Sequence, residues 1–326
     1  MVSSPDFFPP RLLSSPKPRS TGLTHVLDRL GPLEDGFLKT LAPYADIVKI
    51  GWGLPLLLSQ ESLRRRIQRY HEVGVPVCTG GTLLEYAIVH QKEDSAIRQA
   101  RSLGFDMMEI SEGIIDLTPP QMESLSAKIR SRDLDVLIEV GKKNPHVQYS
   151  LRETLERIGH ARTLKPRKVI LESRETGRGV GIYDSEGGIK WDWVHAILAA
   201  YPQDELIFEA PLEGQQVGLI VDLGPDVNLG NVAFESVLPL ASQRQGLRGD
   251  TFGLTRHEGG IEGSPAAKFV YYLLESHHSL DQSDLVRISR LARRTVQSAL
   301  DELKRQGRIT EVVSLRDARK REYRLQ

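Results

Sequence analysis

Short apolar runs alternate with longer stretches of helical periodicity from Gly22 to about Gly249. Apolar runs bounded by glycine, proline or polar residues are typical of buried strands, whereas apolar positions three and four apart are typical of helices. The helical stretches include Gln60–Glu72, Leu83–Leu103, Pro119–Arg132 and Tyr149–Thr163. Eight predicted strands alternate with helical segments: Leu23–Asp28, Asp46–Gly51, Val75–Thr79, Phe105–Ser111, Asp135–Gly141, Lys168–Arg174, Leu206–Glu209 and Val227–Leu229.

Regular alternation of strands and helices predicts a parallel sheet, and eight such units fit a closed (β/α)8 TIM barrel. A doubly wound open sheet is the alternative. Most predicted strands end in polar residues, namely Asp28, Lys49, Glu109, Glu139, Glu172, Arg174, Glu209 and Asn228. Because the loops after the strands form the catalytic face of a barrel, these residues as a set predict an active site. Any one of them could instead belong to an ion pair that fills the barrel interior.

The pattern changes after the last predicted barrel helix. Between Gly253 and Gly263, four glycines occur in eleven residues without an apolar period, which predicts a linker. We therefore divide the chain into four parts: a flexible N-terminal arm (1–20), a barrel (21–255), a linker (256–264) and a second domain (265–326).

The second domain is predicted to be a small winged helix-turn-helix domain. Its helices are predicted at Ala266–Glu275, Asp281–Ser289 and Leu291–Gln306, and its strands at Ile309–Leu315 and Glu322–Leu325. In such a domain the third helix enters the major groove of DNA and the wing binds phosphates. The candidate DNA contacts are Arg293, Arg294, Thr295, Gln297, Arg319, Lys320 and Arg321. A protein-binding domain, a dimer contact and a solvated charged face are the alternatives.

Composition is consistent with two folded parts of different roles. Of the 326 residues, 40% are hydrophobic and 26% are charged, as in ordinary globular proteins. The net charge is zero, but residues 264–326 hold thirteen basic and eight acidic side chains, against thirty and thirty-five elsewhere. Cys78 is the only cysteine, which excludes an intrachain disulfide and a multi-cysteine metal site. Without a membrane-spanning run or a secretory signal, we expect a cytoplasmic protein that does not contact membranes.

Two strand ends carry residues suited to anion binding or proton transfer. Thr82 and Glu85 have capping-box spacing after Gly80-Gly81, which predicts a helix N-terminus that could bind phosphate or carboxylate, unless it is an ordinary tight turn. Lys142 and its neighbour Lys143 follow the fifth predicted strand. A lysine near another cation can donate or accept a proton, although adjacent lysines usually form a solvated loop.

Arginines and glycines follow the later strands. Arg174 and Arg178 belong to a glycine-rich loop that matches neither a Walker nor a Rossmann fingerprint, which excludes NTP and dinucleotide binding by this loop. Gly230 and Arg248 lie after the last two strands, where barrels often bind phosphate. Several carboxylates without a cysteine or histidine cluster predict an oxygen-binding ion such as Mg²⁺.

Together these segments resemble the phosphosulfolactate synthase family of coenzyme M biosynthesis. The resemblance covers about residues 20–252 in order, in Gly22–Thr24, Asp46–Gly53, Gly80–Glu85, Phe105–Ser111, Glu139–Lys143, Glu172–Glu175, Gly181–Tyr183, Phe208–Pro211, Gln215–Gln216, Asn228–Asn231 and Leu247–Thr251. It implies a barrel, Mg²⁺, and addition of sulfite to the methylene carbon of phosphoenolpyruvate, which gives phosphosulfolactate. Arg29 and Thr79 depart from the family pattern, where a lysine and a proline are expected.

The resemblance also implies roles for individual residues. Lys142 is the predicted acid, with Lys49 and Arg174 as further catalytic residues. The predicted metal ligands are Glu139, Glu172 and Glu209, with Asp28 behind them. The predicted substrate-binding residues are Gly80, Gly81, Thr82, Arg178, Asn228, Gly230, Asn231 and Arg248. The alternatives are a DNA-binding regulator whose barrel senses a phosphorylated or sulfonated metabolite, and a catalytically silent relative. We also expect a homo-oligomer.

Overall fold

The computed structural model describes residues 17–51, 53–252, 263–277, 279–313 and 321–325. The chain divides into two compact units, residues 1–256 and 257–326, which we describe separately. Residues 1–16 of the predicted arm and 256–262 of the predicted linker lie outside the described residues. The described end of the arm is anchored, because Arg19 forms a buried ion pair with Asp46 at 2.8 Å.

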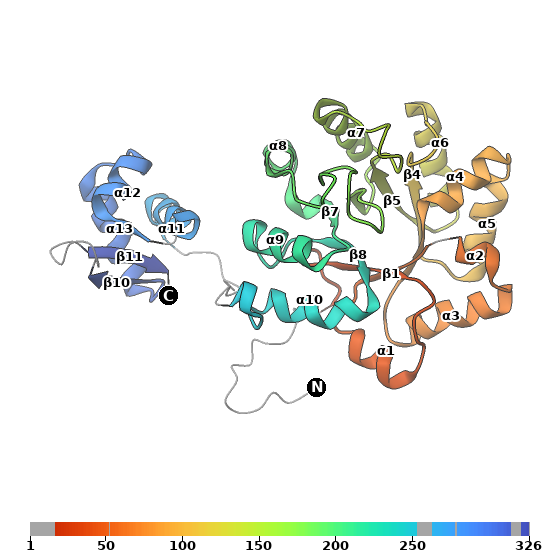
Figure 1. Ribbon diagram of the computed structural model, residues 1–326, viewed down its shortest axis with the longest axis horizontal. Coiled ribbons are helices and arrows are strands. Elements are labelled where there is room, and N and C mark those ends of the chain that lie inside the picture. The colour runs from red at the N-terminus through yellow and green to blue at the C-terminus, as the bar shows by residue number, and fades with distance from the viewer. Residues whose placement is uncertain (1–16, 52, 253–262, 278, 314–320, 326) are drawn as a thin grey trace. The chain divides into compact units, whose positions relative to one another are not determined.

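The first unit is a closed barrel of eight parallel strands, which confirms the predicted TIM barrel and excludes the open sheet (Figure 1). Each strand pairs with the next one along the chain, and β8 pairs with β1 to close the barrel. The strands are β1 (Thr24–Asp28), β2 (Ile47–Ile50), β3 (Val77–Thr79), β4 (Met107–Ser111), β5 (Asp135–Val140), β6 (Lys168–Leu171), β7 (Leu206–Glu209) and β8 (Leu229–Ala233).

Helices surround this barrel (Figure 1). They are α1 (Asp35–Leu41), α2 (Leu54–Leu57), α3 (Gln60–Glu72), α4 (Gly81–Val89), α5 (Glu93–Leu103), α6 (Pro119–Arg130), α7 (Leu151–Thr163), α8 (Trp191–Ala200), α9 (Glu213–Leu223) and α10 (Val237–Arg244), with short 3-10 turns at Gln203–Glu205, Phe234–Ser236 and Gly249–Thr251. The single helix predicted at Leu83–Leu103 is wrong. It breaks into α4 and α5 because Gln91 has a left-handed backbone with a φ of 55°.

The last strand lies further along the chain than predicted, which moves Asn228 to the opposite end of the barrel. The sequence predicts Val227–Leu229, whereas β8 is Leu229–Ala233. Asn228 therefore precedes the strand. Its side chain accepts a hydrogen bond from the Leu23 backbone N–H at 3.0 Å and donates one to the Leu206 carbonyl at 2.8 Å. Both partners adjoin strand starts, so Asn228 ties strands together away from the catalytic face.

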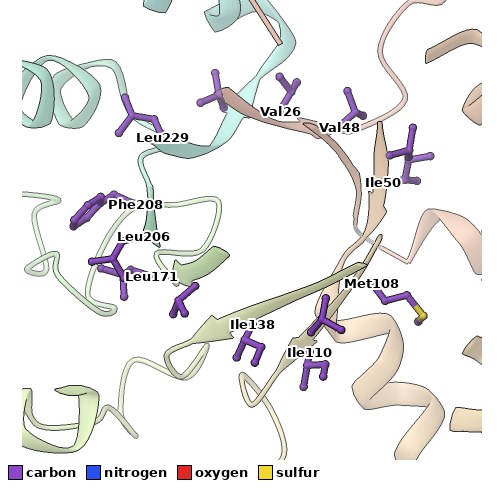
Figure 2. Packing of buried hydrophobic residues seen from close by; sticks show 14 of the residues in the cluster. Val26, Val48, Ile50, Met108, Ile110, Ile138, Leu171, Leu206, Phe208 and Leu229 are labelled. Atoms are coloured by element: carbon purple, nitrogen blue, oxygen red, sulfur yellow. The ribbon is translucent and has the colours of Figure 1, made fainter. Parts of the chain in front are cut away.

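Inward and outward side chains alternate along the strands and build two kinds of core. Outward residues pack between the strands and the helices, and Figure 2 shows ten of them labelled, including Val26, Ile110 and Phe208. Inward residues form a separate apolar layer, which consists of Ile47, Cys78, Met107, Leu137, Ile170 and Ile207. Side chains two residues further along a strand point to the same side, so the next inward layer lies closer to the strand ends.

The second unit combines three helices with a small antiparallel sheet. Its elements are α11 (Pro265–His277), β9 (Leu280–Asp281), α12 (Gln282–Ser289), α13 (Arg293–Arg305), β10 (Ile309–Val313) and β11 (Arg321–Leu325). The strand order is β10-β11-β9, and β9 was not predicted. Val270, Leu274, Leu285, Leu300 and Leu303 belong to its core. Across the described residues of both units, no helix is long and apolar enough to cross a membrane.

Candidate active site

Five charged side chains from five strands form the inward layer above the apolar one. Glu109, Glu139 and Glu209 belong to β4, β5 and β7, Glu172 directly follows β6, and the fifth residue is Lys49 on β2. The Lys49 Nζ atom lies 2.8 Å from Glu209 Oε1, 3.3 Å from Glu109 Oε2 and 3.6 Å from Glu139 Oε2. Only 8% of the Lys49 side chain and 1% of each of these carboxylate side chains is exposed. One buried ammonium group therefore links three strand ends.

Lys143 brings a second ammonium group to the same layer from the loop after β5. Its Nζ atom lies 2.6 Å from Glu139 Oε1 and also contacts Glu172 Oε2. The Lys143 side chain is 26% exposed, so it is the more accessible of the two lysines. Glu109, Glu139, Glu172, Glu209, Lys49 and Lys143 are called the charged cluster below.

Burial and unequal charge set the protonation of the charged cluster. Burial and the neighbouring Glu139 carboxylate raise the pKa of Glu109 to about 8. Burial, together with Glu139 and Glu209, also raises the pKa of Glu172 well above its usual value. Burial opposes ionisation of Glu139 too, but Lys143 and Lys49 hold the pKa of Glu139 well below its usual range. Four carboxyl groups that share two ammonium groups therefore do not all ionise near neutral pH.

Both lysines of the charged cluster are held in the ammonium form. Burial alone would lower each pKa, but the surrounding carboxylates outweigh it and raise the pKa of Lys49 and of Lys143 well above the usual value. The carboxylates that do this are Glu109, Glu209 and Glu139 for Lys49, and Glu139, Glu172 and Glu209 for Lys143. The pocket thus holds two cations at neutral pH.

Backbone N–H groups fix three carboxylates of the charged cluster. Gly81 N–H donates to Glu109 Oε1 at 2.7 Å, and Ser173 N–H donates to Glu209 Oε2 at 3.0 Å. Arg174 N–H donates to Glu172 Oε1 at 2.5 Å. Because the donors belong to strand ends and the start of α4, the carboxylates are oriented before any ligand arrives.

Glycines permit the close approaches on which this geometry depends. A Cβ atom on Gly81 would lie 2.3 Å from the Ser111 hydroxyl oxygen, so only glycine lets α4 start against β4. A Cβ atom on Gly141 would lie 2.5 Å from the Glu172 Cβ, and Gly141 also has a φ of 147°. Gly141 therefore allows the turn that carries Lys143 over Glu172.

The charged cluster lines a pocket at the barrel mouth. Seventeen residues line it, and they include the predicted site residues Lys49, Gly80, Gly81, Thr82, Glu139, Glu172, Glu209 and Asn231. Thr82 and Glu85 do not form the predicted capping box, because Glu85 is buried and accepts backbone N–H groups of Ile114 and Ile115. The helix begins two residues earlier than that box implies, at Gly81.

Asp28 does not join the charged cluster. Its carboxylate binds the Arg66 guanidinium and accepts a hydrogen bond from the Tyr70 hydroxyl at 2.7 Å. It also accepts the backbone N–H of Leu30 at 2.8 Å. These partners belong to α3 and to the loop after β1, so we withdraw Asp28 as a metal ligand and assign it a structural role.

Lys142 is also directed away from the pocket, although it adjoins Lys143. Its Nζ atom lies 2.7 Å from Asp116 Oδ1 and donates to the Ile115 carbonyl at 3.0 Å. Lys142 does not line the pocket, whereas Lys143 does. Of the two adjacent lysines, only Lys143 therefore places its ammonium group in the pocket.

The predicted anion-binding arginines do not converge on the pocket either. Arg174 is half-buried and has a left-handed backbone, Arg178 is exposed, and Arg248 pairs with Glu213 at 2.6 Å. None of the three lines the pocket. Gly230 has a packing role, since a Cβ atom there would lie 2.8 Å from the Ile207 Cγ2.

The predicted nucleic-acid contacts fall in the second unit. Arg293 and Arg294 are exposed at the start of α13, and Thr295 is half-buried beside them. Gln297 is half-buried and hydrogen-bonds Gln282 and Asp301. Arg321 begins β11 and lies 3.5 Å from Glu311. Arg319 and Lys320 lie outside the described residues.

Two functional candidates, Glu109 and Lys143, were noted at strand ends in the sequence but were assigned no role of their own. The sequence pattern could have identified Glu109. Each of four predicted strands has an apolar residue two positions before its glutamate, as Met107 is before Glu109, so the four glutamates occupy equivalent inward positions. The spacing of four residues between Glu139 and Lys143 does not by itself show that the two side chains meet. Choosing Lys143 over Lys142 depends on the direction of the loop after β5.

The residues of the charged cluster fit a divalent cation. One oxygen each of Glu139, Glu172 and Glu209 lies within 4.8 Å of the others. The amide oxygen of Asn231 in the same pocket is buried and has no hydrogen-bond partner among the described residues. Mg²⁺ prefers such oxygen ligands, and a cation would offset the negative charge of the neighbouring carboxylates, which together with burial raises the pKa of Glu172.

Comparison with known proteins decides the family. Residues 13–250 match the family described as (2R)-phospho-3-sulfolactate synthase (ComA). The chain belongs to the phosphosulfolactate synthase family. A member named phosphosulfolactate synthase from Methanocaldococcus jannaschii is 37% identical over 237 residues, which cover 71% of this chain and 94% of that protein. A second, from Methanothermobacter thermautotrophicus, is 38% identical over 250 residues, which cover 75% and 95%.

Membership of the phosphosulfolactate synthase family confirms the predicted family and makes the chain an enzyme of the lyase type. Every member of the charged cluster lies inside the matched residues, whereas the second unit lies outside them. One solved structure, a phosphoenolpyruvate phosphomutase from Streptomyces platensis subsp. rosaceus, is similar with 11% identity and a TM-score of 0.42, covering 67% of this chain and 78% of that one. A similarity of that size supports no inference about function.

Proposed function

We propose that the pocket adds sulfite to the methylene carbon of phosphoenolpyruvate and forms phosphosulfolactate. The observation that carries this proposal is the position of the charged cluster inside a matched region that spans nearly the whole length of the named synthases. The pocket also contains what the reaction requires, since it combines fixed carboxylates, two ammonium groups and an accessible mouth.

The charge of the pocket supports a requirement for Mg²⁺. Sulfite and phosphoenolpyruvate are both anions, whereas the charged cluster contains four carboxyl groups and only two ammonium groups. An added divalent cation would offset this imbalance, and Glu139, Glu172, Glu209 and Asn231 would hold it. When bound, Mg²⁺ would supply Lewis-acid stabilisation of the negative charge that develops on the substrate carboxylate.

The same geometry indicates which residue supplies the proton that the reaction requires. The sulfur lone pair of sulfite forms the new carbon–sulfur bond at the methylene carbon, and the electrons of the double bond move toward the substrate carboxylate. The resulting enediolate takes up one proton at the carbon that bears the phosphate. Lys143 is the candidate donor, because its Nζ atom lies in the pocket beside Glu139 and its side chain is the more accessible of the two lysines. Lys49 is more deeply buried and positions the carboxylates.

The test is direct. Purified protein is incubated with phosphoenolpyruvate, sulfite and Mg²⁺, and phosphosulfolactate is followed by ³¹P NMR and mass spectrometry. We expect product that depends on sulfite and disappears when EDTA removes the metal. Absence of product over millimolar ranges of both substrates and of Mg²⁺ overturns the assignment, and full activity in EDTA overturns the metal requirement.

For the second unit we propose a winged helix. The supporting observations are the element order, with three helices before a β-hairpin, and the pairing of β11 with both β10 and β9. Assembly of the full chain into a homo-oligomer stays a prediction, which sedimentation of the purified protein can test.

A further inference from the structure

The second unit contains two helices joined by a tight turn. α12 ends at Ser289 and α13 begins at Arg293, and Arg290 between them has a left-handed backbone with a φ of 56°. One face of α13 is buried through Val296, Leu300 and Leu303. The opposite face is accessible, which is the arrangement that helix-turn-helix proteins use to present their second helix.

Positive charge gathers on the turn and at the start of α13. Arg290, Arg293 and Arg294 are all exposed. Arg290 and Arg294 have no acidic partner among the described residues, and the side-chain hydrogen bond of Arg293 goes to the neutral Ser283 hydroxyl at 3.4 Å. Arg287 differs from them, because it pairs with Asp284 at 2.8 Å on its own helix.

The sheet carries a weaker positive charge than the helices. Arg321 lies 3.5 Å from Glu311, and Arg324 lies 3.4 Å from Glu322, so both sheet arginines are partly neutralised. The acidic residues of α13, Asp301 and Glu302, lie about two turns beyond its first residue. Among the described residues of the second unit, three exposed arginines without an acidic partner therefore lie together on the turn and the first turn of α13, and we call them the arginine edge (Arg290, Arg293 and Arg294). Lys268 on α11 and Arg305 at the end of α13 are also exposed, but they lie outside this group.

The partner that fits the arginine edge is a polyanion that accepts a helix. Phosphates are the natural partners of exposed, unpaired arginines, and the major groove of B-form DNA admits an α-helix. The major groove of duplex RNA is too narrow for one. Gln297 lies on the next turn, and its amide would contact a base edge only by exchanging its hydrogen bonds to Gln282 and Asp301.

The positions of the exposed apolar side chains favour DNA over a protein as the partner of α13. The core of a protein–protein interface needs large apolar or aromatic anchors. Among the described residues of the second unit, the exposed large apolar side chains are Phe269 and Tyr272, and both belong to α11. The accessible face of α13 presents none. We propose that the second unit binds duplex DNA in the major groove through the arginine edge, a role that goes beyond the lyase activity of the barrel.

The test uses the full chain and a fluorescently labelled mixed-sequence DNA duplex of about 30 base pairs, whose binding is followed by anisotropy against salt concentration. The test variant is Arg293→Ala/Arg294→Ala. The matched control is Lys39→Ala/Arg152→Ala, which removes the same charge from exposed positions on the barrel, where these side chains are 71% and 86% exposed.

We expect the test variant to lower affinity by about tenfold or more and to reduce the slope of log K against log salt by about two, since each phosphate contact contributes about 0.9. The control should keep the wild-type affinity and slope, and Arg293→Lys/Arg294→Lys should keep most of the binding. Unchanged synthase activity and far-ultraviolet circular dichroism would show that the test variant is folded.

Three results would overturn the proposal. The first is no binding of the duplex by wild-type protein at low salt, and the second is an equal loss in the test variant and the control. The third is tighter binding of a single strand of the same sequence. Self-association that Phe269→Glu abolishes, without any duplex binding, would assign the second unit to protein contacts instead.

Discussion

The two units place the same kinds of charged side chain in opposite environments. In the barrel, four carboxyl groups and two ammonium groups share one buried layer, where each group determines the protonation of its neighbours. In the second unit, Arg290 and Arg294 are exposed and lack an acidic partner among the described residues. Burial thus lets neighbouring charges set one another's protonation, whereas exposure leaves an arginine accessible from solvent, where the polyanion proposed above would bind it.

Removing one charge from the buried layer should have the largest effect on activity. Glu139→Gln keeps the shape of the side chain but removes a predicted metal ligand and the shared partner of Lys49 and Lys143. We expect kcat/KM to fall about 10³-fold, because metal ligation and charge balance are lost together. Steady-state synthase assays at saturating Mg²⁺ measure the effect. Exposed Glu123→Gln on α6 is the control, and equal activity of the two variants would exclude a catalytic role for Glu139.

The adjacent lysines provide the next test. Lys143→Ala should lower kcat about 10²-fold or more, as expected for a lost proton donor, with a smaller change in KM. Lys142→Ala should stay within about tenfold of wild type, because Lys142 pairs with Asp116 outside the pocket. Single-turnover and steady-state rates of both variants measure this split. The reverse order of effects would return the acid role to Lys142.

Backbone geometry under the charged cluster predicts a smaller effect, on stability. Gly141→Ala should cost about 1–3 kcal/mol, because the new Cβ would lie 2.5 Å from Glu172 Cβ at a φ that L residues rarely adopt. Gly214→Ala on α9 is the control, since its Cβ would have no neighbour within 4 Å, and it should be neutral or stabilise by up to about 1 kcal/mol. Urea unfolding measures both, and equal stability of the variants would contradict the close packing at Gly141.

Acid should lower the free energy of unfolding of the barrel through His25. Burial, and then the charge of Lys49, hold the pKa of His25 well below its usual 6.5, so the folded state keeps it neutral. The unfolded state binds a proton below about pH 6.5, so this residue lowers the free energy of unfolding by up to about 1.4 kcal/mol per pH unit as the pH falls. His25→Leu should flatten that slope between pH 6.5 and 5, whereas exposed His146→Gln should not. Identical slopes in wild type and His25→Leu would contradict this contribution.

The smallest effect is expected at the exposed arginine edge. Arg294→Ala should change the free energy of unfolding by less than about 0.5 kcal/mol, because Arg294 has no ionic partner among the described residues. Thermal unfolding of the full chain measures the change. A loss of more than about 1 kcal/mol would show that this charge stabilises the fold and would weaken the contrast between the two units.

The barrel was predictable from sequence to a large extent because its signal is periodic. The eight strands occur in the predicted order, and Leu206–Glu209 and Gln60–Glu72 match the predicted bounds. The failures have local causes, since a single left-handed residue, Gln91, splits one helix and a shift of two residues at the start of β8 carries Asn228 to the other end of the barrel. The periodic pattern of apolar residues predicts neither the break in the helix nor the shifted start of the strand.

The meeting of glutamates from several strands at one end of a barrel follows from the amino-acid pattern alone, because parallel strands end on the same side and inward positions repeat every two residues. Which charges share that layer depends on the folded chain. It brings Lys143 rather than Lys142 over Glu139, leaves Asp28 with Arg66, and keeps Arg248 with Glu213. The physical reason is that the direction of a loop side chain depends on partners distant in the chain, which no local pattern specifies.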